Sequence, residues 1–273
     1  MGIDLHIHST FSDGSYTPNQ IISMATNLTA ISITDHDTVA AYYNIDSIPG
    51  LKVIPGVEIT AYSPYEVHVL GYFSNLNIDA FQSNLRKVNL KRQKDLLCIV
   101  SKLYHDNLID ITPASLIKNY TRLSLETIYS FVFRKNPNIS REMFYVDKSY
   151  INNCNIGISV EEAIDLIKKY NGLSVLAHPN RYNDTCKHNQ MNIFDFIKYL
   201  SVRGLDGIEC YHESFSEIEI QNFTNIAQRT NLIVTGGSDF HGENKSRIEL
   251  GIGRGTLDIP NNLLIRIKEY LEC

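Results

Sequence analysis

The feature that most constrains this chain is the placement of its histidines, which repeatedly follow short apolar strands. The first case is Asp4-Leu5-His6-Ile7-His8, where alternation puts the three polar residues on one face of a strand and the two apolar residues on the other. Two imidazoles on one strand face can bind the same metal ion. A half-buried strand with polar residues towards solvent would show the same pattern, so the rest of the chain must separate the two interpretations.

Strands and helices alternate in the two end regions of the chain. Apolar segments with strand-like composition occupy residues 4–8, 30–34, 51–60, 66–72, 173–177, 207–210 and 232–235. Helices are predicted beside them at residues 18–27, 38–46, 159–172, 193–203, 216–229 and 260–271. This alternation predicts an α/β fold with a largely parallel sheet.

The middle of the chain has a different pattern. Apolar residues fit one face of a long helix that begins near residue 80, and shorter helices are predicted at 113–119, 124–135 and 140–146. We therefore predict an α/β domain formed by residues 1–79 and 159–273, with a helical insertion at 80–158. The long helix carries five bases within nine residues, which indicate a solvated helix face or a surface that attracts a polyanion: Arg86, Lys87, Lys91, Arg92 and Lys94.

The composition argues against several classes of protein. A net charge of −5 gives no general attraction to nucleic acid or anionic membranes, so a phosphate-bearing partner must be bound at a local site. Five scattered cysteines without a CxxC pair argue against a disulfide framework or a structural zinc cluster. The chain shows no signal peptide and no apolar stretch of membrane-spanning length, so we expect a cytoplasmic protein without a membrane partner.

Histidines and acids gather at the ends of the predicted strands. Seven of the nine histidines lie there together with Asp13, Glu58 and Asp239, namely His6, His8, His36, His68, His178, His212 and His241. The carboxyl ends of parallel strands converge on one face, where catalytic groups assemble. Even when His212 is left out, nine potential ligands remain, and one catalytic metal binds only three or four protein ligands. We therefore expect two or three divalent ions with a bridging carboxylate. Because cysteine is absent from the set, the candidates are zinc, manganese and iron.

Several segments resemble, in order, the motifs of the PHP (polymerase and histidinol phosphatase) family. They are residues 4–9 (DLHIHS), 12–14 (SDG), 34–37 (TDHD), 56–59 (GVEI), 177–179 (AHP) and 237–241 (GSDFH). The resemblance covers both end regions of the chain and implies a distorted (β/α)7 barrel of the PHP type with a trinuclear metal site.

The resemblance also implies which residues bind which ion. One metal would take His6, His8, Glu58 and Asp239, a second would take Glu58, His68 and His178, and the third would take Asp13, His36 and His241. Three further acids are expected to orient ligands rather than to bind metal: Asp4, Asp35 and Asp37.

Within the family, the chain resembles small nucleotide phosphoesterases, which act on 3′,5′-nucleotide bisphosphates or on the 5′ ends of short RNA. Their helical insertion occupies the same place and commonly contains Gly-Arg-Pro-His, where this chain has Thr121-Arg122-Leu123-Ser124. The insertion is therefore expected to form part of the substrate site. Ser124 stands in place of the histidine of that subgroup, and the sequence leaves open whether this changes specificity.

Three residues are candidates for contacts with substrate. Arg122 and Arg181 could each bind phosphate through two hydrogen bonds, or could form ordinary salt bridges. His212 lies at a strand end outside the implied metal sets, so it could protonate the leaving group, contact phosphate or be a structural histidine.

Together these features predict a metal-dependent phosphoesterase in which a metal-activated hydroxide attacks the phosphorus of a nucleotide or short RNA. Histidinol-phosphate phosphatase is the nearest alternative, since it shares the metal motifs. A metal-binding PHP module without catalytic activity is the alternative from a different class, and the complete ligand set argues against it. The sequence predicts neither which metal is bound nor the oligomeric state.

Overall fold

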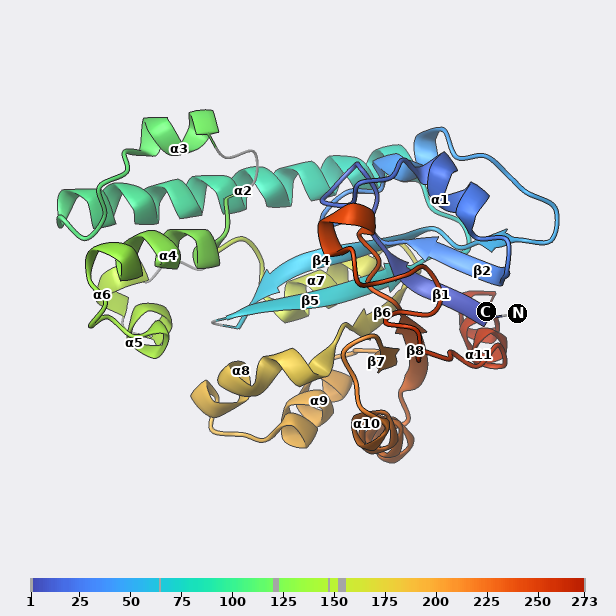
Figure 1. Ribbon diagram of the computed structural model, residues 1–273. Coiled ribbons are helices and arrows are strands. Elements are labelled where there is room, and N and C mark those ends of the chain that lie inside the picture. Colours follow the sequence, from blue (N-terminus) through green and yellow to red (C-terminus); the bar gives the residue numbers. More distant parts are fainter. Residues whose placement is uncertain (1, 64, 120–122, 147, 152–155, 273) are drawn as a thin grey trace.

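The computed structural model describes residues 2–63, 65–119, 123–146, 148–151 and 156–272, and two β-sheets lie at its centre (Figure 1). Its strands are β1 (Gly2–Ile7), β2 (Leu28–Ile33), β3 (Lys52–Val53), β4 (Gly56–Tyr62), β5 (Glu66–Tyr72), β6 (Leu173–Leu176), β7 (Gly207–His212) and β8 (Ile233–Gly237). Most of their side chains are buried, as the apolar composition of these segments requires.

The two sheets meet at the ends of their strands. Parallel strands form the order β1-β2-β3, and the second sheet has the order β4-β5-β6-β7-β8. Single bridges connect the sheets on two sides, between Ile7 and Phe240 and between His36 and Glu58. The predicted α/β fold is confirmed, whereas the ladders between the described strands form two sheets and not one closed barrel.

The second sheet is only partly parallel, which differs from the largely parallel sheet expected from the sequence. β5 pairs antiparallel with both β4 and β6, while β6, β7 and β8 are parallel. Residues 63–65 alone connect β4 to β5, and so short a connection permits a hairpin but not the crossover of a parallel pair. As a result, the amino end of β5, which carries His68, lies beside the carboxyl end of β6.

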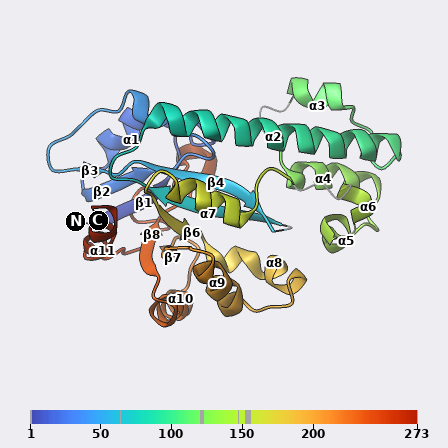
Figure 2. The ribbon, with the colours of Figure 1, turned by 180° about the vertical axis from the view of Figure 1, so that it is seen from behind.

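Helices surround the sheets, with α2 above them and α8, α9 and α10 below them in Figure 1, and α7 lies in front of β4 in the reverse view of Figure 2. The helices are α1 (Pro18–Met24), α2 (Ile78–His105), α3 (Pro113–Asn119), α4 (Leu125–Lys135), α5 (Arg141–Val146), α6 (Lys148–Ile151), α7 (Val160–Lys168), α8 (Asn183–His188), α9 (Ile193–Val202), α10 (Glu217–Thr230) and α11 (Leu263–Leu271). Three short 3₁₀ helices are η1 (Ala40–Tyr43), η2 (Pro179–Tyr182) and η3 (Gly242–Lys245), and η1 replaces the helix expected at 38–46.

The long helix α2 joins two hydrophobic cores. Phe81 and Leu85 in its first half belong to the main cluster, which the sheets and their covering helices share. Leu96 and Leu103 in its second half belong to a separate cluster with residues of α4 and α5, such as Ile128. In Figure 1, α3 to α6 accordingly gather around the outer half of α2, away from the sheets.

The basic run of α2 is exposed, with one exception. Arg86, Lys87, Lys91 and Lys94 face solvent, as a solvated helix face requires. The expectation is wrong for Arg92, whose guanidinium is buried against the sheet domain and lies 2.7 Å from Asp37 Oδ2. A buried acid on a neighbouring segment explains why this base turns inward, because neither charge could be buried alone.

Candidate metal centre

The polar strand ends converge at one edge of the two sheets. The ring centroids of His8 and His241 are 4.1 Å apart, and those of His8 and His36 are 4.6 Å apart. The centroids of His68 and His178 are 5.1 Å apart. The structure thus brings together all nine residues that the sequence predicts as ligands, namely His6, His8, Asp13, His36, Glu58, His68, His178, Asp239 and His241.

The first predicted set brings two imidazoles to two carboxylates. Glu58 Oε2 lies 3.2 Å from His6 Nε2 and 3.0 Å from His8 Nε2. Asp239 Oδ1 lies 3.7 and 3.4 Å from the same two nitrogens. Ligand atoms bound at 2.0–2.1 Å to a tetrahedral ion are about 3.3 Å apart, so these separations fit one shared ion.

The second set uses the other oxygen of Glu58. Oε1 of this residue lies 2.8 Å from His68 Nδ1 and 3.1 Å from His178 Nε2. Glu58 therefore presents one oxygen to each set of histidines, which is the geometry of a bridging carboxylate.

The third set surrounds Asp13, in the loop after β1. Its Oδ1 lies 3.4 Å from His241 Nε2, and its Oδ2 lies 3.7 Å from His36 Nε2. His8 also contributes, because its Nδ1 is 3.4 Å from Asp13 Oδ1. Oxygen and imidazole atoms from these four side chains lie within 4.8 Å of one another.

Buried ring nitrogens show that the donor set fits a cation. His6 Nε2 and His8 Nε2 are buried, and no group in the described part of the chain forms a hydrogen bond with either. Glu58 Oε2 lies 3.2 and 3.0 Å from these nitrogens without forming a hydrogen bond, and a bound metal would satisfy both of them. Imidazole and carboxylate donors suit zinc, manganese and iron, so the residues fit a divalent-metal centre.

The histidines of the centre hold its carboxyl groups ionised. Burial would raise the pKa of Glu58, but nearby imidazoles, first that of His36, outweigh burial and hold the pKa well below its usual range. Burial would also raise the pKa values of Asp239 and Asp13, but neighbouring histidines outweigh it and lower both values. Three carboxylates are thus ready to bind cations at neutral pH.

The imidazoles divide into two groups. Burial lowers the pKa of a histidine, and nearby carboxylates raise it. For His8 and His68 the carboxylates outweigh burial and raise the pKa to about 9 and about 10. Burial prevails for His178 and His241, and their pKa values are lowered.

Three residues at or beside the centre have an unusual backbone conformation. His178 has a φ of 27°, and both Asp37 and Asp239 have a φ of 55°. Residues other than glycine rarely adopt such angles, and they persist where the surroundings fix them for a functional geometry.

The three acids that were expected to orient ligands form hydrogen bonds with residues beside the predicted ligands or in β4. The carboxylate of Asp4 accepts hydrogen bonds from the backbone N–H and from the hydroxyl of Ser238, the residue before Asp239. The carboxylate of Asp35 accepts hydrogen bonds from the backbone N–H and from the hydroxyl of Ser9, the residue after His8.

The third of these acids, Asp37, accepts the backbone N–H of Thr60 and pairs with Arg92. It thereby joins the residue after His36 to β4 and to α2.

Three residues that contact predicted ligands were not among the residues predicted from the sequence. Glu209 Oε1 lies 3.0 Å from His6 Nδ1, and its Oε2 accepts the backbone N–H of His178 at 2.7 Å. The hydroxyl of Tyr182 forms a hydrogen bond with His178 Nδ1, and Glu66 Oε1 lies 2.8 Å from His68 Nε2. An acid inside an otherwise apolar strand could have identified Glu209, and Tyr182 lies three residues after the AHP motif, whereas the contact of Glu66 carries no signal in the sequence.

The predicted substrate residues have different surroundings. Arg181 Nη2 lies 3.2 Å from Asp239 Oδ2, at the rim of the centre. His212 is buried, and its Nε2 lies 3.6 Å from the same oxygen. Arg122 lies outside the described residues. Ser124, in place of the subgroup's histidine, caps α4 by accepting the N–H of Thr127 at 3.1 Å.

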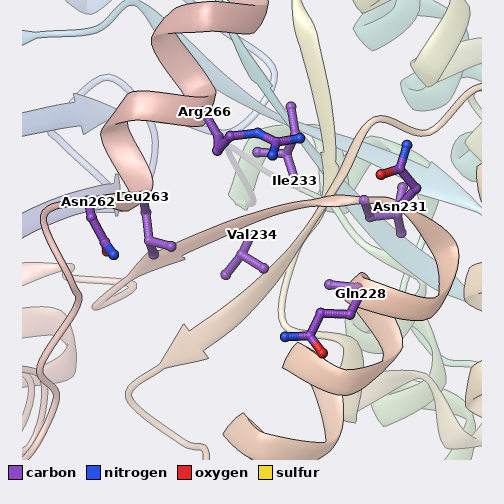
Figure 3. A pocket seen from close by; sticks show the side chains of 9 residues that line it. Gln228, Asn231, Ile233, Val234, Asn262, Leu263 and Arg266 are labelled. Atoms are coloured by element: carbon purple, nitrogen blue, oxygen red, sulfur yellow. The ribbon is translucent and has the colours of Figure 1, made fainter.

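A separate cleft of about 410 Å³ lies at the other end of β8 (Figure 3). It is lined by residues of α10, β8 and α11, including Gln228, Val234 and Arg266. The predicted site residues are not among the described residues that line it, so the cleft is not part of the candidate site.

Among the helices that the structure describes, none combines the length and apolar composition needed to cross a membrane.

Comparison with curated proteins finds relatives that match nearly the whole chain. A phosphoribosyl 1,2-cyclic phosphate 1,2-diphosphodiesterase from Eggerthella lenta is 27% identical over 88% of this chain and 94% of its own. The 5′-3′ exoribonuclease Rnm of Escherichia coli is 30% identical over 87% of this chain and 84% of its own. A 3′,5′-nucleoside bisphosphate phosphatase from Chromobacterium violaceum is 26% identical over 94% of this chain and 92% of its own. These relatives confirm the prediction of an enzyme that hydrolyses phosphoric esters.

A solved structure shares the fold as well. A candidate metal-dependent phosphoesterase from Bifidobacterium adolescentis matches with a TM-score of 0.66 and 26% identity, over 99% of this chain and 96% of that chain. The family model of the PHP domain matches residues 4–172, a range that includes His6, His8 and Glu58. The family that the motifs predicted is confirmed, and the chain belongs to the PHP domain family.

Proposed function

We propose that this protein is a divalent-metal-dependent phosphoesterase that acts on small nucleotides, such as 3′,5′-nucleotide bisphosphates, or on the 5′ ends of short RNA. The observation that carries the proposal is the position of Glu58, whose Oε2 faces His6 and His8 while Oε1 faces His68 and His178. Sites with two metals about 3.5–4 Å apart clamp both the attacking and the leaving oxygen of a phosphate ester. The names of the relatives supply the class of substrate.

The number of ions is proposed as three. The donor atoms of Asp13, His36 and His241 lie close enough together, with His8 beside them, for an ion of their own, while His36 Nδ1 is also 3.3 Å from Glu58 Oε2. The two sheets and their bridges around this centre support the distorted (β/α)7 barrel that the family resemblance implies.

The chain's own residues would position the ester. Divalent ions bound here would supply a water molecule of lowered pKa and positive charge beside the phosphate oxygens. His212 Nδ1 accepts the backbone N–H of Ser214 at 3.1 Å, so the neutral ring carries its proton on Nε2. That N–H points to the Asp239 side of the centre, where it can donate to a phosphate oxygen or to the leaving oxygen.

The helical insertion at 80–158 is proposed to form one wall of the substrate site. Arg92 joins the insertion directly to the segment that holds His36, which supports this role. A phosphate contact by Arg122 remains a prediction from the resemblance to nucleotide phosphoesterases. A cytoplasmic location also remains a prediction, based on the scattered cysteines.

The test combines metal analysis with a panel of substrates. Purified protein should contain zinc, manganese or iron, and should release phosphate or nucleotide from adenosine 3′,5′-bisphosphate or from short RNA with a 5′-phosphate. A phosphoribosyl cyclic phosphate and histidinol phosphate complete the panel. Turnover of histidinol phosphate alone would favour the alternative phosphatase, and metal binding without any turnover would favour a non-catalytic module.

A further inference from the structure

Lys245 lies beside the metal centre, although no sequence motif points to it. It is the last residue of η3, which follows His241. Its Nζ lies 2.8 Å from Asp239 Oδ2, within hydrogen-bond distance.

The two oxygens of Asp239 have different surroundings. Oδ1 faces the histidines, at 3.4 Å from His8 Nε2 and 3.5 Å from His241 Nδ1. Oδ2 faces the cations, at 2.8 Å from Lys245 Nζ and 3.2 Å from Arg181 Nη2, and also lies 3.6 Å from His212 Nε2. The carboxylate thus separates the proposed metal positions from a pair of positively charged side chains.

This pair of cations exceeds the charge of the acid that it contacts. One carboxylate faces two positive groups, and binding of Asp239 to metal would withdraw still more of its negative charge from them. The side chains of Lys245 and Arg181 are 36% and 42% exposed, whereas that of Asp239 is 3% exposed. The excess positive charge therefore reaches solvent at the rim of the centre, where an anionic substrate must enter.

The turn that carries Lys245 is held in place. Gly242 has a φ of 64°, and a Cβ atom there would overlap Ser15 Oγ. The N–H of Glu243 donates to Ser15 Oγ at 2.8 Å, and the side chain of Asn244 donates to the carbonyl of Asp13 at 2.9 Å. Lys245 is thus fixed relative to the loop that carries Asp13, which reduces the entropy lost when it binds a ligand.

We propose that Lys245 is a substrate-binding residue, which binds an oxygen of the substrate's phosphate group on the Asp239 side of the metal centre together with Arg181. The inference rests on the proposed phosphoesterase function and names a residue for it. Lys245 supplies a compact positive charge and Arg181 a planar fork, so the two can bind different oxygens of one phosphate. On binding, the phosphate takes over the hydrogen bonds that both cations make to Asp239 Oδ2.

The test measures binding of inorganic phosphate to the metal-loaded protein by calorimetry, with metal content determined for every variant. Lys245→Met should weaken phosphate binding by about tenfold or more, the value of one charge-assisted hydrogen bond. Lys245→Arg should restore part of the affinity. Arg247→Met is the matched control, because it removes the same charge from an exposed position two residues further on, and it should bind phosphate as the wild type does.

Three results would overturn the inference. They are unchanged phosphate affinity in Lys245→Met, loss of metal in this variant, and equal weakening in Arg247→Met. Loss of metal would show that Lys245 only orients Asp239, and equal weakening would show a general effect of charge. The substrate panel tests the proposed function separately, because phosphate binding does not require turnover.

Discussion

At the scale of single residues, the centre depends on carboxylates that do not bind the ions themselves. Glu209 is buried in the middle of β7, where it contacts His6 through one oxygen and the backbone of His178 through the other. Its bond to His6 Nδ1 keeps the ring oriented with Nε2 towards Glu58. Such partners fix the tautomer and the orientation of a ligand and raise its basicity.

Substitution Glu209→Gln should therefore weaken metal binding. The amide offers one acceptor oxygen where the carboxylate offers two, so one of the two donors loses its partner. We expect metal affinity or turnover to fall by about 10–100-fold while the fold persists. Titration with a competing chelator measures the affinity, and Glu217→Gln on the exposed face of α10 is the control. Unchanged affinity in the Glu209 variant would contradict this role.

The charged histidines predict that metal binding releases protons. The raised pKa values of His8 and His68, about 9 and about 10, keep both rings protonated at pH 7 in the metal-free protein. A ligating imidazole must be neutral, so each ring gives up a proton when it binds an ion. Apparent affinity should rise as pH increases from 6 towards 9. Calorimetry in buffers of different ionisation enthalpy counts the protons, and a heat that is independent of the buffer would refute the prediction.

The candidate ligands could be predicted from the sequence because they lie in the predicted strands or close after them, where polar residues interrupt or end an apolar segment. Lys245 could not be predicted, since its contact with Asp239 depends on the path of a turn. Glu66 and Tyr182 were missed for the same reason, because their contacts to histidines depend on side-chain directions.

At the scale of elements, α2 connects the helices α3 to α6 to the two sheets. Arg92 Nη1 pairs with Asp37 Oδ2, and its Nη2 lies 2.9 Å from Asn89 Oδ1. Asn89 in turn donates to the carbonyl of Asp37 at 3.1 Å. The middle of α2 is thereby fixed to the residue that follows His36, so the position of the insertion is linked to that of a predicted ligand.

Substitution Arg92→Met should destabilise the protein strongly. Asp37 would remain buried without its charged partner, and breaking such a pair costs about 3–5 kcal/mol of unfolding free energy. Denaturant unfolding measures the loss, and Lys94→Met on the exposed side of α2 should change it little. The double variant Arg92→Met/Asp37→Asn should lose less than the two single losses added together. Additive losses would show that the two side chains act independently.

The helices were predicted more closely than the pairing of the strands. The segments expected at 113–119, 124–135 and 140–146 correspond to α3, α4 and α5, because their apolar spacing and capping residues are local signals. The antiparallel direction of β5 was not predicted, since it depends on the length of a connection and not on strand composition. Burial of Arg92 was not predicted either, because its partner lies 55 residues away.

At the scale of the whole molecule, the first strand, β1, and the last helix, α11, lie close together and share one hydrophobic cluster (Figures 1 and 2). β1 pairs with β2 on one side and meets the segment after β8 on the other, through the bridge between Ile7 and Phe240. The centre therefore combines residues from position 6 to position 241, and an ion there would link the first and last strands. No local pattern in the sequence shows this closure, which depends on contacts over most of the chain.

Removal of metal should loosen this edge of the molecule and leave the insertion unchanged. An ion bound only by the folded state stabilises it by about 4 kcal/mol when its concentration is a thousand times the Kd. We expect chelation to abolish turnover and lower the Tm reversibly, while the apolar core of α4 and α5 keeps its protection from hydrogen exchange. Exchange should increase at residues 34–37 and 238–242, which flank the predicted ligands. Equal loss of protection in α4 would show that the insertion depends on the metal, and no change at either segment would contradict the assigned centre.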